Sequence, residues 1–584
     1  TDNTFGDATI TLREFQAYYD TSIIRDDLNN ALYLARIKAD FIQKDVIKEH
    51  YTAQDVSKLD SLIKKGEKAL LGKTQSEIDA ATHEIDNCLQ YLSEKPEPGE
   101  ADYNLIYQKS FDSMVGNNLE YTDERKETIK QLEDTVEKDW ELLIKSPSKQ
   151  LFEEYFILGE TDIQPVADSV KRINNMAIAY LQEHNRYYQN KELLEDIISS
   201  LRFVTDEKFD NSIEQYGNWY GWVVSVPREL ANSLILLDKE MPEEMKEKIH
   251  DAILFRTGGE NYYQVWSGGN RTYLCNVYLK LAASTRNEKY FRGIEFTLQD
   301  QSVWHESVSD EGFLYDGTFT AHIGYVYNSG YGLDLLNNSA NFMSLLHGTI
   351  WEVDQCMIDD FAKKILLGFE PILVNGIASD VVGGRGLGRG LYYGVAISNA
   401  IANIAEFSAE PYKTIFLAFA KECALQNGTS NRYSNDNMIV ERGPVTNFKR
   451  FVMGDKVVYS NPNFGFGLGM YSNRIRNFER VNDEVRKAWY CNSGALYVMN
   501  HDVNQYDNNY WIAVNHYHIP GTTVDMIPRK LDKWDGEGYS PYSWVSSMDF
   551  DEKYGCAGYT NYNFFSTLKS LKSYFVFDDE IVCI

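Results

Sequence analysis

The spacing of apolar residues divides the chain into a short helical segment, a long helical segment and a final segment with a different period. Between Ile23 and about Ser93 the pattern predicts three helices. The clearest signal is a capping box, Thr74-Gln-Ser-Glu77, which an apolar stripe at helical spacing follows. The stripe consists of Ile78, Ala81, Ile85, Cys88, Leu89 and Leu92. We therefore predict a small antiparallel bundle of three helices over residues 1–95.

A second helical region follows a linker, residues 94–100, whose two prolines and glycine cannot continue a helix. Helical periods dominate from about Asp102 to Asp436, and long loops rich in Gly, Trp and Tyr connect them. The predicted helices include residues 125–144, 166–183, 191–201, 227–237, 243–254 and 337–346. Many helices with functional loops at one end favour an (α/α) toroid over a parallel-sheet fold, so we assign a toroid to residues 102–436.

The period changes after about Asn437, where short β-branched or aromatic segments alternate with Asn, Asp and Gly. The predicted strands lie in residues 451–459, 465–471, 494–499 and 510–514. We predict an antiparallel β-sandwich domain over residues 437–584. The chain stops at Ile584 just after a strand-like segment, so we expect this domain to be incomplete there. The fold class is therefore a multidomain α+β protein.

The composition restricts the partners. The net charge is −29, with 86 acidic against 57 basic residues, which argues against nucleic acid as the main ligand. The 40 tyrosines and 10 tryptophans suit flat surfaces that stack on sugar rings or bases. An anionic ligand would need a local concentration of Arg, Asn and Tyr. Seven scattered cysteines without C-x-x-C spacing indicate neither a disulfide framework nor a zinc site. No apolar run approaches the ~20 residues of a membrane span.

One segment, residues 310–332, lacks a clean helical or strand period and is typical of an active-site loop. It places His322 nine residues before Tyr331, among glycines and tyrosines. An imidazole and a phenol together can take a proton and give one back. A lone pair of this kind is more often a core histidine in a tyrosine-rich wall, so the hypothesis depends on the segments around it.

Four other segments carry polar and aromatic groups in a fixed order: residues 216–222 (YGNWYGW), 267–271 (SGGNR), 383–390 (GGRGLGRG) and 472–482 (SNRIRNFERVN). With the loop they give N-W-(W/Y) followed by Pro, (S/T)-G-(A/G)-N-R, D-G-(S/T)-F-x-x-H-x8-Y-G, R-x-x-x-R and N-x-E shortly before W-Y. Together these motifs resemble polysaccharide lyase family 8, which includes the hyaluronate, chondroitin AC and xanthan lyases. The resemblance covers about residues 102–584.

The resemblance implies a toroid packed on a β-sandwich, with a cleft between them, and β-elimination at a uronic acid. The C5 proton of a uronate is weakly acidic because its removal places a second negative charge beside the carboxylate. A donor to that carboxylate stabilises the developing enolate by about 3 to 4 kcal/mol. In this reading Asn270 is that donor, Tyr331 is the base and then the acid, His322 assists the transfer, Arg385 adds charge-assisted bonds, and Glu479 supports the tyrosine and arginine.

The remaining side chains that the resemblance assigns to substrate are Trp219, Tyr220, Trp222, Arg271, Arg389 and Asn482. For the aromatic residues the alternative is packing in the helical core, and for Arg271 we favour a structural ion pair. The loop Trp219-Tyr-Gly-Trp222 departs from the Trp-Trp pattern of many members, which puts a glycosaminoglycan subsite in doubt. The Gly268-Gly269 pair is closer to the xanthan-lyase branch.

The short helical segment resembles the three-helix FIVAR modules that are appended to bacterial surface carbohydrate enzymes. The chain begins at Thr1 without Met, as it would after signal removal or trimming, which leaves secretion open. With the resemblance to these surface enzymes, we expect a secreted or cell-surface bacterial protein. We also expect a monomer that acts on an acidic polysaccharide and requires no cofactor, with Ca²⁺ only in a structural role.

Two other functions remain open on the residues alone. One is a carbohydrate-binding surface protein on a lyase scaffold that has lost catalysis. The other is a toroid glycoside hydrolase, which would need two carboxylates flanking the scissile bond. Asp310, Glu311 and Asp316 are near His322, but no chemical argument selects a pair among them.

Overall fold

The computed structural model describes residues 24–45, 53–72, 74–91, 99–157, 161–429, 431, 433–443, 445–481, 484–500, 502–507, 509–525, 527–529, 538–563 and 566–584. The chain forms two compact units. The smaller unit contains helices α2 (Asp26–Asp45), α3 (Ala53–Ala69) and α4 (Gln75–Tyr91). The larger unit holds the strands of the described residues and the helices from α5 onward, except that the first three residues of α15 group with the smaller unit.

The three helices of the smaller unit share one buried cluster, to which each contributes leucine, isoleucine or alanine. Helix α4 begins where the sequence predicts, because Thr74 Oγ1 accepts a hydrogen bond from the Glu77 backbone N–H at 3.4 Å. The Glu77 carboxylate in turn accepts a hydrogen bond from the Thr74 hydroxyl at 3.0 Å. Ile78, Ala81 and Ile85 are buried, so the predicted apolar stripe is the face of α4 that packs on the cluster.

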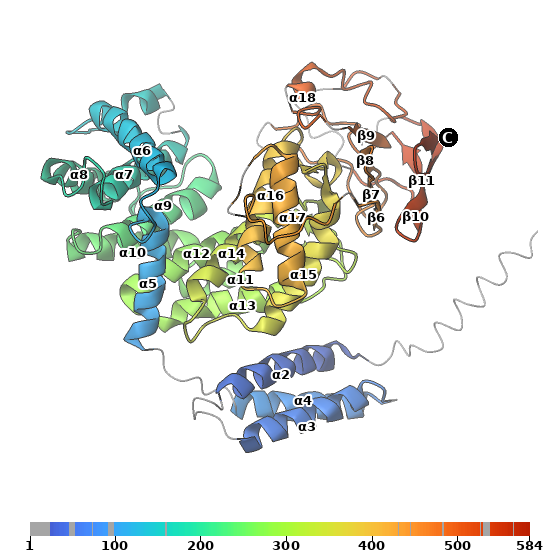
Figure 1. Ribbon diagram of the computed structural model, residues 1–584, viewed down its shortest axis with the longest axis horizontal. Helices are drawn as coiled ribbons and strands as arrows, with labels where there is room; N and C mark the ends of the chain where they lie inside the picture. The colour runs from blue at the N-terminus through green and yellow to red at the C-terminus, as the bar shows by residue number, and fades with distance from the viewer. Residues whose placement is uncertain are drawn as a thin grey trace, which may run out of the picture. The chain divides into compact units, whose positions relative to one another are not determined.

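The larger unit begins with a helical part (Figure 1). Its helices are α5 (Glu100–Val115), α6 (Asp123–Leu142), α7 (Gln164–Leu181), α8 (Lys191–Glu207), α9 (Val226–Leu236), α10 (Glu243–Thr257), α11 (Tyr262–Val265), α12 (Gly268–Thr285), α13 (Phe291–Ser302), α14 (Tyr331–Leu346), α15 (Gln355–Gly368), α16 (Gly390–Ala405) and α17 (Tyr412–Gln426). Helix α14 packs between α12 and α16, and α16 packs on α17. This arrangement brings the start of α12 beside the start of α14.

Short strands interrupt the helical part. β1 (Gly312–Phe313), β2 (Phe319–Ala321) and β3 (Tyr325–Val326) form an antiparallel sheet just before α14. β4 (Leu373–Val374) pairs with β5 (Ile377–Ala378) shortly before α16. The loop that the sequence predicts at residues 310–332 is therefore a small meander whose last turn leads directly into α14.

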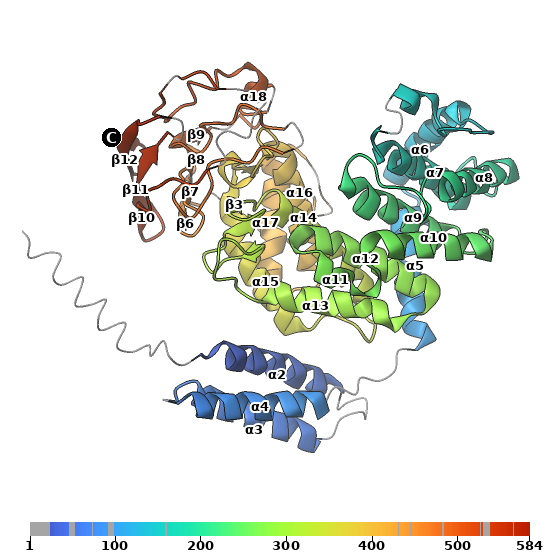
Figure 2. The same cartoon turned by 180° about the vertical axis from the view of Figure 1, so that it is seen from behind.

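Two four-stranded antiparallel sheets follow. The first contains β6 (Asn447–Phe451), β7 (Lys456–Ser460), β8 (Gly465–Gly469) and β9 (Ala495–Met499). The second contains β10 (Val545–Phe550), β11 (Tyr554–Tyr562), β12 (Lys569–Val576) and β13 (Ile581–Cys583). Tyr459 and Phe466 of the first sheet share a buried cluster with Tyr559 and Tyr574 of the second. In both views the sheets lie beside the end of the helical part that carries α16 (Figures 1 and 2).

A helix-rich part followed by antiparallel sheet agrees with the prediction, but two predicted strands are wrong. Residues 451–459 are not one strand, because residues 452–455 form a turn with Asp455 at φ 54° between β6 and β7. Residues 510–514 contain a short helix, α18 (Tyr510–Ala513), instead of a strand. Among the described residues, no helix combines the length and apolar character needed to cross a membrane.

Candidate active site

The turn between β2 and β3 presents His322. Three consecutive residues, His322, Ile323 and Gly324, have φ values of 51°, 58° and 90°, in the left-handed region. A β-branched residue rarely adopts this conformation, and such strain is usually held by surrounding contacts at functional sites. Here the His322 backbone N–H donates to Glu311 Oε1 at 3.1 Å, and the Gly324 carbonyl accepts from the Arg476 N–H at 3.0 Å. The turn is therefore fixed from two sides.

Tyr331 is the first residue of α14, and Asn270 lies in the first turn of α12. The predicted Gly-rich turn at residues 267–271 is in fact the start of this helix. A Cβ added to Gly269 would lie 3.0 Å from the Tyr331 carbonyl oxygen, so glycine allows the two helix starts to approach. Among the described residues, the Asn270 amide oxygen is buried without a hydrogen-bond partner. Asn270 thus lies on the helix start that adjoins the start of α14, and the N–H groups of its amide are the ones able to donate to a carboxylate.

Glu479 lies in the segment between β8 and β9. Through its side chain the sheet part of the unit contacts the residues of the helical part. The Glu479 carboxylate is buried, with 3% of the side chain exposed. Oε1 bonds to Nδ1 of His322, and Oε2 accepts from the Tyr327 hydroxyl and from Arg385 Nη1, the latter at 3.0 Å. A buried carboxylate is costly unless donors surround it, and this one has three. Because His322 Nδ1 is occupied, Nε2 is the ring nitrogen left for a substrate.

Arg385 links Glu479 to the phenol. Its Nη2 donates to the Tyr331 hydroxyl at 3.2 Å, while its Nε donates to Glu484 Oε2 at 3.0 Å. The His322 and Tyr331 ring centroids are 4.6 Å apart. The structure therefore brings together four of the predicted catalytic side chains, His322, Tyr331, Arg385 and Glu479, in one cluster, with Asn270 on the neighbouring helix start.

A second layer of polar groups lies one helical turn behind Tyr331. Asp334 Oδ1 accepts from the Tyr273 hydroxyl at 2.8 Å, which joins α14 to α12. Burial raises the pKa of Asp334, and the Tyr273 hydrogen bond and the Arg385 charge oppose that rise. Burial also raises the pKa of Tyr220, whose ring contacts Tyr273 edge-on at 6.1 Å. Tyr220 thus connects the aromatic loop to α12.

A cleft of about 460 Å³ opens beside Arg385. Its charged lining consists of Arg385, Arg389, Glu484, Arg486 and Lys487, and its apolar lining includes Trp511 and Ile512. The Arg389 side chain is 53% exposed, and its Nη2 lies 3.8 Å from Glu484 Oε1. Basic groups outnumber acidic ones here although the whole chain carries a charge of −29. This is the local cationic concentration that an anionic ligand would need.

The aromatic residues at positions 219, 220 and 222 differ in how far their side chains are exposed. Trp219 is 42% exposed and stacks on Trp266, with ring centroids 4.9 Å apart and planes 14° apart. Trp222, however, has no exposed surface, and its Nε1 donates to the Tyr216 carbonyl at 2.8 Å. The prediction that Trp222 stacks on a sugar is therefore wrong, because the ring packs in the core against Phe209 and Arg256.

The assignment of Arg271 to substrate binding is also wrong. It is buried, and its Nη2 donates to Asp300 Oδ2 at 2.6 Å while its guanidinium lies over the Phe296 ring. It forms the structural ion pair that the sequence argument favoured over contact with substrate. The predicted substrate residue Asn482 lies outside the described residues.

Sequence reasoning missed three residues of the site, namely Trp266, Glu311 and Tyr327. Glu311 accepts from the Ser267 hydroxyl at 2.5 Å and from the His322 N–H, so it joins the α12 start to the β2–β3 turn. Glu311 and Tyr327 stand inside the 310–332 segment, where only its histidine and last tyrosine were given roles. Trp266 directly precedes the SGGNR motif, and that adjacency was a usable signal.

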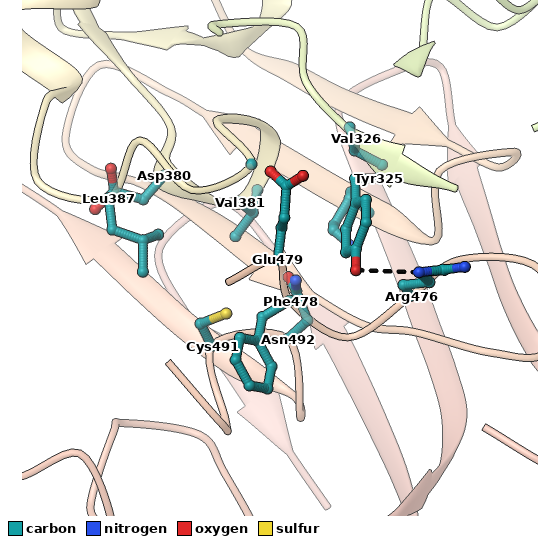
Figure 3. Close-up of a pocket in the computed structure, with 12 residues that line it drawn as sticks. Tyr325, Val326, Asp380, Val381, Leu387, Arg476, Phe478, Glu479, Cys491 and Asn492 are labelled. Carbon is teal, nitrogen blue, oxygen red and sulfur yellow. Dashed lines mark hydrogen bonds between the residues drawn. The ribbon is translucent and has the colours of Figure 1, made fainter. Parts of the chain in front are cut away.

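A small cavity of about 20 Å³ lies behind Glu479 and is lined by Tyr325, Arg476, Cys491 and Asp380 among others (Figure 3). The Arg476 guanidinium donates to the Tyr325 hydroxyl at 3.5 Å. This volume suits a single water molecule. The cavity is too small for a sugar, whereas the cleft beside Arg385 is large enough for one. We take that cleft as the candidate substrate site; of the catalytic cluster, Arg385 is the member that lines it.

Asp380 fixes the loop that carries Arg385. Its carboxylate accepts from the Gly388 N–H at 3.2 Å and from Trp511 Nε1 at 2.9 Å, which ties the loop to the sheet part. Burial raises the pKa of Asp380 from 3.8 to about 7, and the nearby charge of Asp507 adds to the rise.

This pKa predicts a pH dependence of stability. Between pH 3.8 and about 7 the folded protein keeps the Asp380 proton while the unfolded chain loses it, so this contribution to stability falls as the pH rises. Asp380→Asn, which cannot ionise, should raise the Tm relative to wild type near pH 8, and the gain should shrink towards about pH 4. Thermal unfolding across this range checks the expectation. Asp134→Asn, at an exposed position of α6, is the control, and an Asp380→Asn gain that is equal at every pH would contradict it.

The family follows from comparison with known proteins. The model of the polysaccharide lyase family 8 N-terminal alpha-helical domain matches residues 112–418, and the model of the family's super-sandwich domain matches residues 446–584. The chain belongs to polysaccharide lyase family 8. The two matched regions coincide with the helical part and the sheet part that meet at Glu479.

Individual relatives point the same way. A xanthan lyase of Bacillus sp. is 28% identical over 459 residues, which cover 74% of this chain and 47% of that protein. A hyaluronate lyase of Enterococcus faecalis is 25% identical over 463 residues, which cover 73% of this chain and 45% of that protein. The chain thus spans about half the length of these curated relatives.

Solved structures support the fold. A Paenibacillus xanthan lyase superimposes with a TM-score of 0.75 at 25% identity, over 83% of this chain and 48% of that one. A Streptomyces coelicolor chondroitin AC lyase superimposes with a TM-score of 0.72 at 20% identity, over 83% of this chain and 69% of that one. A helix-rich domain followed by an antiparallel sheet domain is therefore the family architecture.

Proposed function

We propose that this protein cleaves a glucuronate-containing acidic polysaccharide by β-elimination and leaves a 4,5-unsaturated uronyl product. The observation that carries the proposal is the contact of the Arg385 guanidinium with both the Tyr331 phenol and the buried carboxylate of Glu479. A phenol is a poor base at neutral pH, and a guanidinium at hydrogen-bond distance stabilises its anion. The family and its xanthan and hyaluronate lyases support this reading.

The reaction that we propose needs one proton carrier and one carboxylate ligand. The substrate carboxylate faces the Asn270 amide, which stabilises the charge that develops as the C5 proton leaves. The phenolate oxygen of Tyr331 takes that proton, the C5–H electron pair forms the C4=C5 double bond, and the C4–O4 bond breaks. Tyr331 then returns the proton to O4. His322, oriented through Nδ1 by Glu479, presents Nε2 to the same region.

We propose that Arg389 and Trp219 contact neighbouring sugar residues. Arg389 lines the cationic cleft, which suits an acidic polymer, and Trp219 offers an exposed ring face that its stacking on Trp266 holds in place. Tyr220 is half-buried behind it and is a weaker candidate for direct contact. We also propose that Asn482 contacts the substrate, as the family resemblance implies.

Two carboxylates that lie near His322 in the sequence, Glu311 and Asp316, do not suit a hydrolase. Glu311 is engaged by Ser267 and the His322 backbone. Asp316 accepts from the Thr318 and Met453 backbone N–H groups at 2.9 and 2.7 Å. Both groups hold turns together, whereas a glycosidase needs one carboxyl that donates a proton and another that attacks or activates water. Elimination is therefore the better reading of the site.

The wider assignment completes the proposal. We propose that the helices α5 to α17 close into an (α/α) toroid and that the smaller unit is a FIVAR-like module. We also propose a secreted or cell-surface bacterial protein that acts as a monomer, does not bind nucleic acid, and needs no metal for elimination, with Ca²⁺ at most structural.

Ultraviolet absorbance during incubation with xanthan, hyaluronan, chondroitin and a heparin-type chain tests the function. A rising conjugated-alkene signal on at least one glucuronate polymer is expected, and a parallel sample with a chelator should rise at the same rate. New reducing ends without that signal would mean hydrolysis. Binding without either signal would mean a carbohydrate-binding protein, and both outcomes would overturn the proposal.

A further inference from the structure

Tyr327 is a buried tyrosine at the centre of the site to which the proposed reaction gives no part. Only 3% of the residue is exposed. Its ring contacts His322 and Tyr331 edge-on, with centroid distances of 5.9 and 5.1 Å. Tyr327 therefore lies directly behind the two side chains that handle the proton.

The backbone of Tyr327 holds the start of α14 in place. Its N–H donates to the Phe319 carbonyl of β2 at 2.8 Å. Its carbonyl accepts from the Gly330 and Gly332 N–H groups at 3.1 and 2.9 Å, so it satisfies donors that a helix start would otherwise leave free. Tyr331 stands between those two glycines. The position of its Cα is consequently tied to Tyr327.

The ring of Tyr327 occupies space that the Arg385 loop leaves open. A Cβ on Gly384 would lie 2.0 Å from Tyr327 Cε1, and Gly384 has a φ of 57°. Both facts require glycine at the position just before Arg385. The loop therefore fits closely over the tyrosine ring, which places the Arg385 backbone at the phenol.

The hydroxyl of Tyr327 uses its full bonding capacity on two site residues. It donates to Glu479 Oε2 and accepts from the Arg385 N–H at 3.2 Å and from Arg385 Nη1 at 3.4 Å. Arg385 Nη1 also donates to the same Glu479 oxygen at 3.0 Å. One hydroxyl thus joins the backbone and the guanidinium of Arg385 to the carboxylate that orients His322.

We propose that Tyr327 is a positioning residue for the elimination, and that its hydroxyl holds the Glu479–Arg385 pair so that Arg385 Nη2 stays on the Tyr331 phenol. The inference rests on the proposed function and assigns Tyr327 no contact with substrate. A donor that moves by about 1 Å can cost roughly 100-fold in rate, so a small loss of alignment at Arg385 is sufficient for a large effect.

Tyr327→Phe tests the proposal, because it keeps the ring and the backbone and removes only the hydroxyl. We expect kcat to fall about 10- to 100-fold while KM stays within about twofold, since substrate contacts are intact. Tyr325→Phe is the matched control: it removes a hydroxyl two residues away that bonds Arg476, and it should leave kcat unchanged. Unchanged kcat in Tyr327→Phe, or equal losses in both variants, would overturn the inference.

A double-mutant cycle with Arg385→Lys separates positioning from a general structural role. If Tyr327 acts through Arg385, its replacement in the Arg385→Lys background should cost less than about threefold in kcat. Full multiplication of the two losses would overturn the proposal, as would a large fall in Tm accompanied by a raised KM. A wild-type protein that gives no alkene on any polymer defeats the proposed function and this inference together, whereas an active wild type matched by Tyr327→Phe defeats the inference alone.

Discussion

Replacement of Tyr331 by phenylalanine is expected to lower kcat at least about 1,000-fold on the polysaccharide that the wild-type protein cleaves. The phenol oxygen is the only atom lost, and in the proposed reaction it carries the proton both from C5 and to O4. KM should change by less than about threefold, because the ring, the cleft and Asn270 remain. Initial rates from alkene absorbance over a range of substrate concentrations give both constants.

Stability should not explain that loss. Arg385 Nη2 lies at 3.2 Å from the Tyr331 oxygen in a half-buried position, so removal of this bond costs roughly 1 kcal/mol of folding free energy. Tyr392→Phe, at an exposed tyrosine of α16, is the control and should keep wild-type rates. If Tyr331→Phe retains most of its activity, His322 Nε2 becomes the candidate base, and His322→Ala should then lose what Tyr331→Phe keeps.

The helices were predictable because their signals are local. Helix α10 begins at Glu243, as its apolar pattern predicts, and the box at Thr74 and Glu77 marks the start of α4. Patterns repeated at helical spacing need no knowledge of distant contacts. The convergence of His322, Tyr331, Arg385 and Glu479 was inferred instead from five motifs in a family order, because residues 157 positions apart cannot be paired by periodicity.

The failures have tertiary causes. Trp222 stands in the aromatic loop with Trp219, and the sequence offers no sign that a π-helical turn, Gly221–Ser225, rotates it into the core. Residues 510–514 are aromatic and β-branched, yet Asn509 at φ 65° starts a short helix that places Trp511 on Asp380. In both places a long-range contact overrides the local preference.

Tyr327 is a functional residue that the sequence analysis missed for the same reason. In the sequence it is one of several tyrosines in a Gly-rich loop, and nothing local distinguishes it from Tyr325. The distinction arises in three dimensions, where one hydroxyl meets Glu479 and Arg385 and the other meets Arg476. Positioning residues are set by contacts between distant segments, so motif reasoning selects the groups that react and misses the groups that hold them.

Replacement of Asn270 is expected to have the second large effect, because it removes the amide that donates to the substrate carboxylate in the proposed reaction. Asn270→Ala should lower kcat about 100- to 1,000-fold, the usual loss for one donor to a developing oxyanion. Asn270→Asp has nearly the same shape but places a second carboxylate against that of the substrate, so kcat/KM should fall further than in the alanine variant. Steady-state kinetics of the two variants on one polymer make the comparison.

The order of these two variants is the informative result. Asn341→Ala, at an exposed asparagine of α14, serves as the control and should keep wild-type kinetics. The buried Asn270 oxygen has no partner among the described residues, so the alanine variant forfeits no internal hydrogen bond through that oxygen and its fold should persist. If the aspartate variant is as active as the alanine variant, or more so, then no anionic group of the substrate lies against position 270. The enolate would then have to be stabilised from the Arg385 side of the cleft.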